Sequence, residues 1–222
     1  MKSSKNPRGN DSNPPPVVVL LAGGAARRMG GGDKGMRIMG GVPILRRVLD
    51  LARGWTDRIV LSANDDPARF AGLDWLSQLP VLADGVSGRP GPLAGILAAM
   101  DWAAQWAPDS THVLSLPCDT PFLPAGLWPA LATAGGTGVT MAAGPDGSRH
   151  PTVALWPVAL RQPLLHALRD ESLFKVGAFA TRHGLHLVPF PPGPGGIDPF
   201  FNINNPEDLA RAETMLPTHG RV

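Results

Sequence analysis

Short runs of aliphatic and β-branched residues alternate along the chain with longer segments in which apolar residues recur every three to four positions. The short runs have the length and composition of buried strands, and the longer segments have the period of amphipathic helices. Chains that alternate the two in this way form a mostly parallel sheet with helices on both faces. The predicted strands are Val17–Leu21, Arg58–Ser62, Pro80–Ala83, His112–Leu116, Val139–Ala143, Thr152–Trp156 and Leu185–Val188.

Prolines mark the starts of the predicted helices, because a proline suits the opening turn. The last helix has the clearest start: Asn205 can cap it, Pro206 begins it, and the two acidic residues that follow suit the positive end of the helix dipole. It extends to about Met215. The earlier helices are predicted to begin at Pro43, to run from Pro92 to about Trp106, and to open at Pro124.

The chain has 222 residues and a net charge of +2 at pH 7, a size that fits one large α/β domain. It lacks the dense basic patch that nucleic-acid binding would require, and no apolar run approaches the roughly 20 residues of a membrane span. The single cysteine, Cys118, allows no intramolecular disulfide. We therefore expect a cytoplasmic protein without nucleic-acid or membrane partners, with a disordered tail at residues 1–16 and a further tail at residues 217–222.

Polar residues follow four of the predicted strands directly. Gly23–Lys34 follow the first, Asn64 the second, Asp84 the third and Pro117–Pro121 the fourth. In an open α/β sheet, ligands bind at the carboxyl ends of the strands. The sequence therefore predicts one binding site to which these four segments contribute.

The first of these segments is a glycine-rich loop that carries two arginines, Asp33 and Lys34. Glycines let the backbone approach a ligand closely, and arginine and lysine supply positive charge for phosphate oxygens. The loop is not a Walker loop, because Asp33 precedes the lysine and Gly35 follows it, and it lacks the G-x-G-x-x-G dinucleotide pattern. It predicts a cradle for a polyphosphate.

The residues from Leu20 to Lys34 resemble L-A-G-G-x-x-x-R-M-G-x-x-x-K, a signature of nucleotidyltransferases that activate a phosphate with an NTP. The paired glycines and the Asp-Lys pair are similar to the molybdenum cofactor guanylyltransferases, and the resemblance covers about residues 17–216. It implies a three-layer, Rossmann-like nucleotidyltransferase fold, with a nucleotide-binding part at about 17–125 and a pterin-binding part at about 138–216. Four further segments resemble that family: Arg89–Gly95, Leu116–Pro121, His150–Thr152 and Phe201–Leu209.

This resemblance implies GTP and Mo-molybdopterin as substrates and Mg²⁺ as cofactor. Asp119 stands between two prolines, which hold a loop stiff, and would be the metal ligand; the alternative is that it only caps a turn. Arg28 and Lys34 would stabilise the triphosphate and the negative charge on the leaving pyrophosphate. Arg28, Lys34 and Asp119 are therefore the predicted catalytic residues.

The nucleotide is expected to contact backbone groups of the loop and polar side chains at the strand ends. Asp84 can accept hydrogen bonds from guanine, although it could also be a turn aspartate. Together with Lys34 and Asp119, the predicted nucleotide-binding residues are Leu21, Ala22, Gly23, Gly24, Asn64 and Asp84.

For the pterin, the resemblance implies contacts from His150, Lys175, Asn202 and Asn204. The two asparagines alternate, so their amides would face one way in a strand and could bind pterin donors and acceptors. Lys175 could equally be a solvated helix residue. The first alternative function is a cytidylyltransferase or sugar-phosphate nucleotidyltransferase of the same fold, and the second is a non-catalytic cofactor carrier. Molybdoenzyme chaperones or the cofactor-insertion machinery are further candidate partners.

Overall fold

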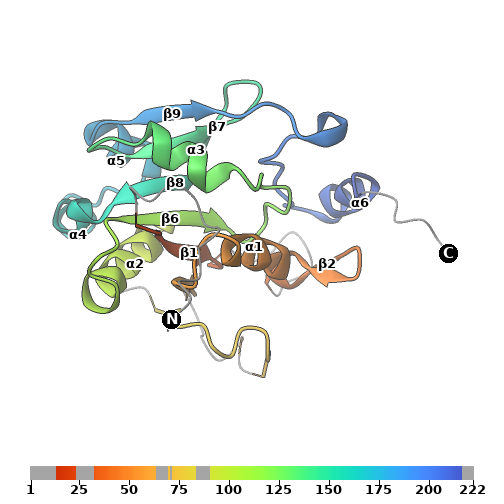
Figure 1. Cartoon of the computed structure of the whole chain (residues 1–222), viewed down its shortest axis with the longest axis horizontal. Coiled ribbons are helices and arrows are strands. Elements are labelled where there is room, and N and C mark those ends of the chain that lie inside the picture. Colours follow the sequence, from red (N-terminus) through yellow and green to blue (C-terminus); the bar gives the residue numbers. More distant parts are fainter. Residues whose placement is uncertain (1–13, 24–32, 64–69, 71, 84–90, 217–222) are drawn as a thin grey trace, which may run out of the picture.

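A computed structural model describes residues 14–23, 33–63, 70, 72–83 and 91–216 (Figure 1). Its centre is a seven-stranded sheet in the order β5-β4-β1-β6-β8-β7-β9. All neighbouring strands pair in parallel except β8, which is antiparallel to both β6 and β7. The strands are β1 (Val17–Leu21), β4 (Ile59–Ser62), β5 (Val81–Leu82), β6 (His112–Pro117), β7 (Thr140–Ala143), β8 (Arg149–Pro157) and β9 (His186–Pro189).

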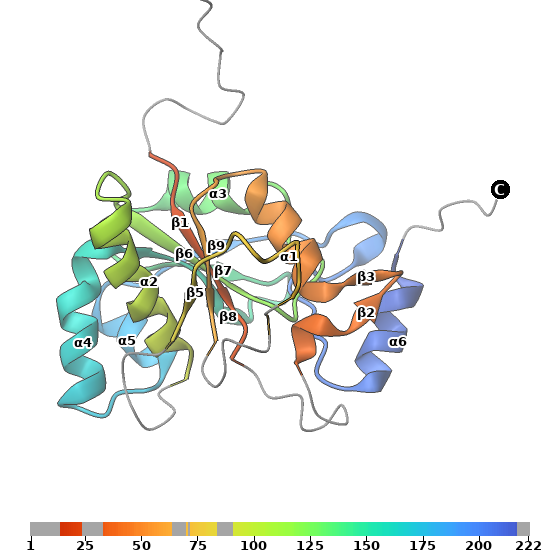
Figure 2. The ribbon, with the colours of Figure 1, turned by 90° about the horizontal axis from the view of Figure 1, so that it is seen from below.

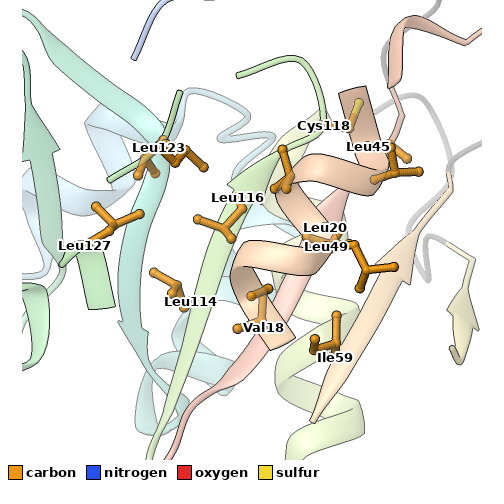
Figure 3. Packing of buried hydrophobic residues seen from close by; sticks show 14 of the residues in the cluster. Val18, Leu20, Leu45, Leu49, Ile59, Leu114, Leu116, Cys118, Leu123 and Leu127 are labelled. Carbon is orange, nitrogen blue, oxygen red and sulfur yellow. The ribbon is translucent and has the colours of Figure 1, made fainter. Parts of the chain in front are cut away.

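Helices cover both faces of this sheet. Successive side chains of a strand point to opposite faces, so Val18 and Leu20 of β1 pack with α1 and α3, while Val17 and Val19 pack with α2, α4 and α5. Figure 3 shows the first of these two cores, with α1 lying over β1, β4 and β6. The helices are α1 (Ile44–Arg53), α2 (Pro92–Trp106), α3 (Leu127–Ala134), α4 (Arg161–Arg169), α5 (Val176–Arg182) and α6 (Pro206–Thr214).

A third, smaller core joins two segments that lie far apart in the sequence. The hairpin of β2 (Ile38–Met39) and β3 (Val42–Pro43) packs against α6. In Figure 2 the hairpin and α6 lie side by side on the right, away from α2, α4 and α5 on the left. Met39, Ile203 and Ala212 are fully buried there. Helix α6 thus lies beside the β2–β3 hairpin, which directly follows the described segment Asp33–Arg37.

The capping of α6 agrees with the prediction. The Asn205 side chain accepts a hydrogen bond from the backbone N–H of Asp208 at 2.7 Å, and the Asp208 carboxylate accepts from the Asn205 N–H at 3.2 Å. This reciprocal pair is a capping box. It fixes the direction in which residues 201–204 enter the helix.

The predicted α/β fold class is confirmed, and each predicted strand is present. The prediction for the third helix was wrong: α3 begins at Leu127, and Pro124 instead belongs to a turn in which its carbonyl accepts from Leu127 N–H at 2.9 Å. The fourth helix α4, the helix α5 and the β2–β3 hairpin were not predicted. β8 is longer than predicted, so His150 lies inside a strand.

None of the helices in the described ranges is both long and apolar enough to cross a membrane. The predicted tails at residues 1–16 and 217–222 lie outside the described residues, except for residues 14–16, which have no regular secondary structure.

Candidate functional site

The strands β5, β4, β1 and β6 end at the same edge of the sheet. Backbone hydrogen bonds between the residues that follow these strands continue the pairing there. Cys118 N–H donates to Leu21 O at 3.3 Å, Ala22 N–H to Ser62 O at 2.9 Å, and Ala63 N–H to Leu82 O at 3.0 Å. Since β4 lies on one side of β1 and β6 on the other, the strand order reverses at β1. This is the position at which open α/β sheets bind their ligands.

A lysine, a carboxylate and an amide meet at this edge. The Lys34 ammonium lies 2.7 Å from Asn204 Oδ1 and 3.4 Å from Asp119 Oδ2. The Lys34 and Asp119 side chains are only 18% and 17% exposed. We call Lys34, Asp119 and Asn204 the lysine cluster. It brings together three of the predicted site residues from distant parts of the chain.

Local packing places Lys34 at the start of a short 3-10 helix, Lys34–Met36. The Asp33 carboxylate caps this helix by accepting from Gly35 N–H at 2.9 Å. A Cβ on Gly35 would lie 3.0 Å from the Leu45 Cβ and 3.1 Å from the Cys118 Cβ. The end of the glycine-rich loop is therefore pressed against α1 and against the residue before Asp119.

Cys118 is a packing residue at this junction. It is buried beside Leu45 (Figure 3). Burial raises the pKa of its thiol well above the usual value, and the charges of Asp119 and Asp33 raise it further. Since the thiolate is the nucleophilic form, this environment disfavours a covalent role for Cys118.

The Asp119 loop is joined to the segment Asn202–Asn204. Ile203 N–H donates to the Asp119 backbone carbonyl at 3.0 Å, and the Thr120 hydroxyl donates to Asn202 Oδ1 at 2.5 Å. This segment is not part of a strand, but the predicted alternation holds, because Ile203 is buried while the asparagines on both sides are exposed.

Two residues of this site, Gly35 and Thr120, were not predicted. Thr120 could have been found because it lies in the same Cys-Asp-Thr-Pro motif as Asp119. The role of Gly35 depends on contacts with Leu45 and Cys118, which the spacing along the chain does not reveal.

The structure places the other two predicted pterin residues away from the lysine cluster. His150 stacks on Phe200 with ring centroids 4.3 Å apart, and its Nε2 lies 3.2 Å from the Ser148 hydroxyl. Phe200 lies two residues before Asn202, so His150 is connected to the asparagine segment through this ring. Lys175 is exposed at the start of α5, on the face of the sheet that α2 and α4 cover, and the structure does not bring it to the cluster.

Four predicted residues lie outside the described residues: Gly24, Arg28, Asn64 and Asp84. Leu21, Ala22 and Gly23 are described. Leu21 O and Ala22 N–H form the bonds between strand ends given above, and the predicted contacts of these three residues with a base stay a prediction.

The donors available to a metal ion at this edge are oxygens. Among the described residues they include the Asp119 carboxylate and the amide oxygens of Asn202 and Asn204, and the two amide oxygens already accept hydrogen bonds from Thr120 and Lys34. In the described part of the chain, no three His, Cys, Asp or Glu side chains form a metal-binding group. A carboxylate with further oxygen donors fits Mg²⁺, which takes one or two carboxylates and completes its shell with substrate phosphates and water.

Stability is expected to fall as the pH drops through about 6.5, the value of an unperturbed histidine. Burial lowers the pKa values of His112, His150 and His183 below that of an unfolded histidine. Below pH 6.5 the unfolded chain therefore binds more protons than the folded chain, which favours unfolding. The urea midpoint should decrease from pH 7.5 to pH 5.5, and His112→Gln should reduce that decrease. An equal midpoint at both pH values would contradict this expectation.

Comparison with known proteins identifies relatives for most of the chain. The family model described as MobA-like NTP transferase domain matches residues 18–184. A protein of Rhodopseudomonas palustris strain BisB5 named molybdenum cofactor guanylyltransferase is 46% identical over 187 residues, which cover 83% of this chain and 86% of that protein. A protein of the same name from Bradyrhizobium sp. strain ORS 278 is 45% identical and covers 86% of this chain and 88% of its own.

Solved structures share the fold at lower identity. Molybdopterin-guanine dinucleotide biosynthesis protein A from Archaeoglobus fulgidus matches with a TM-score of 0.68 and 22% identity, over 89% of this chain and 97% of that one. Rv0371C of Mycobacterium tuberculosis, in complex with manganese, matches with a TM-score of 0.67 and 17% identity, over 91% of this chain and 100% of that one. At these identities the match supports the fold alone.

Proposed function

The chain belongs to the MobA-like NTP transferase family, and we propose that it transfers GMP from GTP to the terminal phosphate of Mo-molybdopterin, with release of pyrophosphate. Relatives at 45–46% identity over most of the chain are named for this activity. The structural observation that carries the proposal is the lysine cluster at the carboxyl ends of β1 and β6, which combines a cation for phosphate with a carboxylate for a metal ion.

In the proposed reaction, a phosphate oxygen of the pterin attacks the α-phosphorus of GTP, and the bond to pyrophosphate breaks. The attacking phosphate is already anionic, so neither a general base nor a covalent enzyme intermediate is required. Holding the two substrates in line can supply roughly 7–11 kcal/mol of the barrier. Lys34 would donate to the triphosphate and stabilise the charge that develops on the leaving pyrophosphate.

We propose Mg²⁺ as the cofactor. Asp119 would hold it, with the remaining positions filled by phosphate oxygens and water. When bound, the ion neutralises phosphate charge in the transition state. Hydrogen bonding of the Asp119 backbone to Ile203 and the buried packing of Cys118 keep the carboxylate in place. The manganese complex of Rv0371C shows that a protein of this fold binds a divalent ion.

The remaining assignments stay predictions. Arg28, Asn64 and Asp84 would complete the GTP site, and His150, Asn202 and Asn204 would contact the pterin. Lys175 would contact the pterin only if a substrate extends to the start of α5. The cytoplasmic location and the chaperone partners are likewise predictions.

The proposed function is tested by measuring pyrophosphate release from each of the four NTPs with Mg²⁺, with and without molybdopterin. Release that requires both GTP and the pterin is the expected result. Release with CTP in place of GTP would assign the protein to cytidylyl transfer by the same mechanism. GTP binding without any release would favour a non-catalytic carrier, and omission of Mg²⁺ tests the metal requirement.

A further inference from the structure

We propose that Asn204 is a positioning residue that holds the Lys34 ammonium in place for the triphosphate. This inference rests on the proposed function, in which Lys34 binds the phosphates of GTP. The family resemblance implies that Asn204 contacts the pterin. Here Asn204 would in addition act on the nucleotide, by holding Lys34.

The contact between the two residues is the shortest that the Lys34 ammonium makes in the described part of the chain, at 2.7 Å to Asn204 Oδ1 against 3.4 Å to Asp119 Oδ2. The ammonium can only donate, so the amide atom that faces it must be the oxygen. A lysine side chain has a flexible stem and many rotamers. A hydrogen bond at its tip restricts those rotamers before the substrate binds.

An amide suits this task better than a second carboxylate would. The amide oxygen accepts a hydrogen bond but carries no net charge, so it leaves the positive charge of Lys34 available to the phosphates. An ammonium has three N–H donors. Within the residues that the structure describes, one N–H is directed at Asn204 and one toward Asp119, and a third can point at a phosphate oxygen.

Asn204 is itself held firmly by its backbone. Its N–H donates to the Asp208 carboxylate at 2.8 Å, and the same carboxylate completes the capping box of α6. The preceding residue, Ile203, is fully buried, and its N–H is bonded to the Asp119 carbonyl. The exposed Asn204 side chain is therefore directed from a rigid backbone, and the first turn of α6 is linked through it to Lys34.

The test is equilibrium binding of GTP with Mg²⁺ and without pterin, so that a pterin contact cannot influence the result. Asn204→Ala and Asn204→Leu, which both remove the acceptor, should weaken GTP binding about tenfold, the effect of losing one hydrogen bond to a charged group. Gln162→Ala is the control: its exposed amide lies on α4, on the face of the sheet away from α1 and α3, and GTP affinity should stay within about twofold.

The double variants with Lys34→Ala decide whether Asn204 acts through the lysine. In that background Asn204→Ala should weaken GTP binding no further. The positioning role would be overturned if Asn204→Ala reduced GTP affinity equally with and without Lys34. It would also be overturned if Asn204→Ala left GTP affinity unchanged while Lys34→Ala reduced it. Unchanged affinity in Lys34→Ala would instead remove Lys34 from the proposed function, and the positioning role with it. Equal thermal midpoints of the variants establish that the differences arise in the folded protein.

Discussion

Replacement of Asp119 by alanine is expected to reduce the rate of GMP transfer by at least about 10²–10³-fold, the usual cost of removing one group that stabilises transition-state charge. The carboxylate is the proposed metal ligand and lies 3.4 Å from the Lys34 ammonium. The fold should persist, because the bond from Ile203 reaches the Asp119 backbone rather than its side chain. The rate is measured as pyrophosphate release with GTP, molybdopterin and Mg²⁺ at saturating concentrations.

Asp109→Ala is the matched control for this variant. Asp109 precedes β6, at the opposite end of the strand from Asp119, and its exposed carboxylate pairs with Arg58 at 2.8 Å. Its loss should leave the rate unchanged. Asp119→Asn, which keeps the shape but removes the charge, should be nearly as inactive as the alanine variant. Activity close to that of the natural protein in either Asp119 variant would refute the metal-ligand assignment.

Gly95→Ala is expected to destabilise the fold by about 2–3 kcal/mol, within the range seen when atoms are forced into a packed core. An added Cβ would lie 2.3 Å from the Ser62 hydroxyl, 2.9 Å from the Ser62 Cβ and 3.0 Å from a Leu21 methyl group. Helix α2 would have to move away from β1 and β4, directly beneath the strand ends that carry the site. Urea unfolding measures the change, and the apparent affinity for GTP should fall with it.

Gly177→Ala provides the comparison, because this glycine also lies in a helix, α5, and a Cβ there would meet no atom within 4 Å. That variant should be neutral or more stable by up to about 1 kcal/mol, the difference in helix propensity between glycine and alanine. If the two variants had the same stability, close packing of α2 on the sheet would not be the reason for a glycine at position 95.

Predictions of strands and helix starts were confirmed where the signal, an apolar run or a helix cap, lies within a few consecutive residues. Val17–Leu21 is buried on both faces, so its unbroken apolar run indicated a central parallel strand. The start of α6 was predicted because Asn205, Pro206 and Asp208 form a complete cap within four residues. The start of α3 was wrong because Pro124 suits a turn as well as a helix. Helices α4 and α5 were not predicted because both are short, at 9 and 7 residues, and contain few repeats of the helical period.

The sequence by itself thus determined the alternating strands and helices and the polar segments at the strand ends, and it predicted Lys34 and Asp119 as members of the candidate site. Only the tertiary structure decided which of these residues meet. Lys34 and Asn204 are 170 residues apart in the chain, and they touch because the buried Ile203, Met39 and Ala212 pack α6 onto the β2–β3 hairpin. Such contacts depend on how separate elements pack together, and the local period and propensity of a sequence carry no information about that packing.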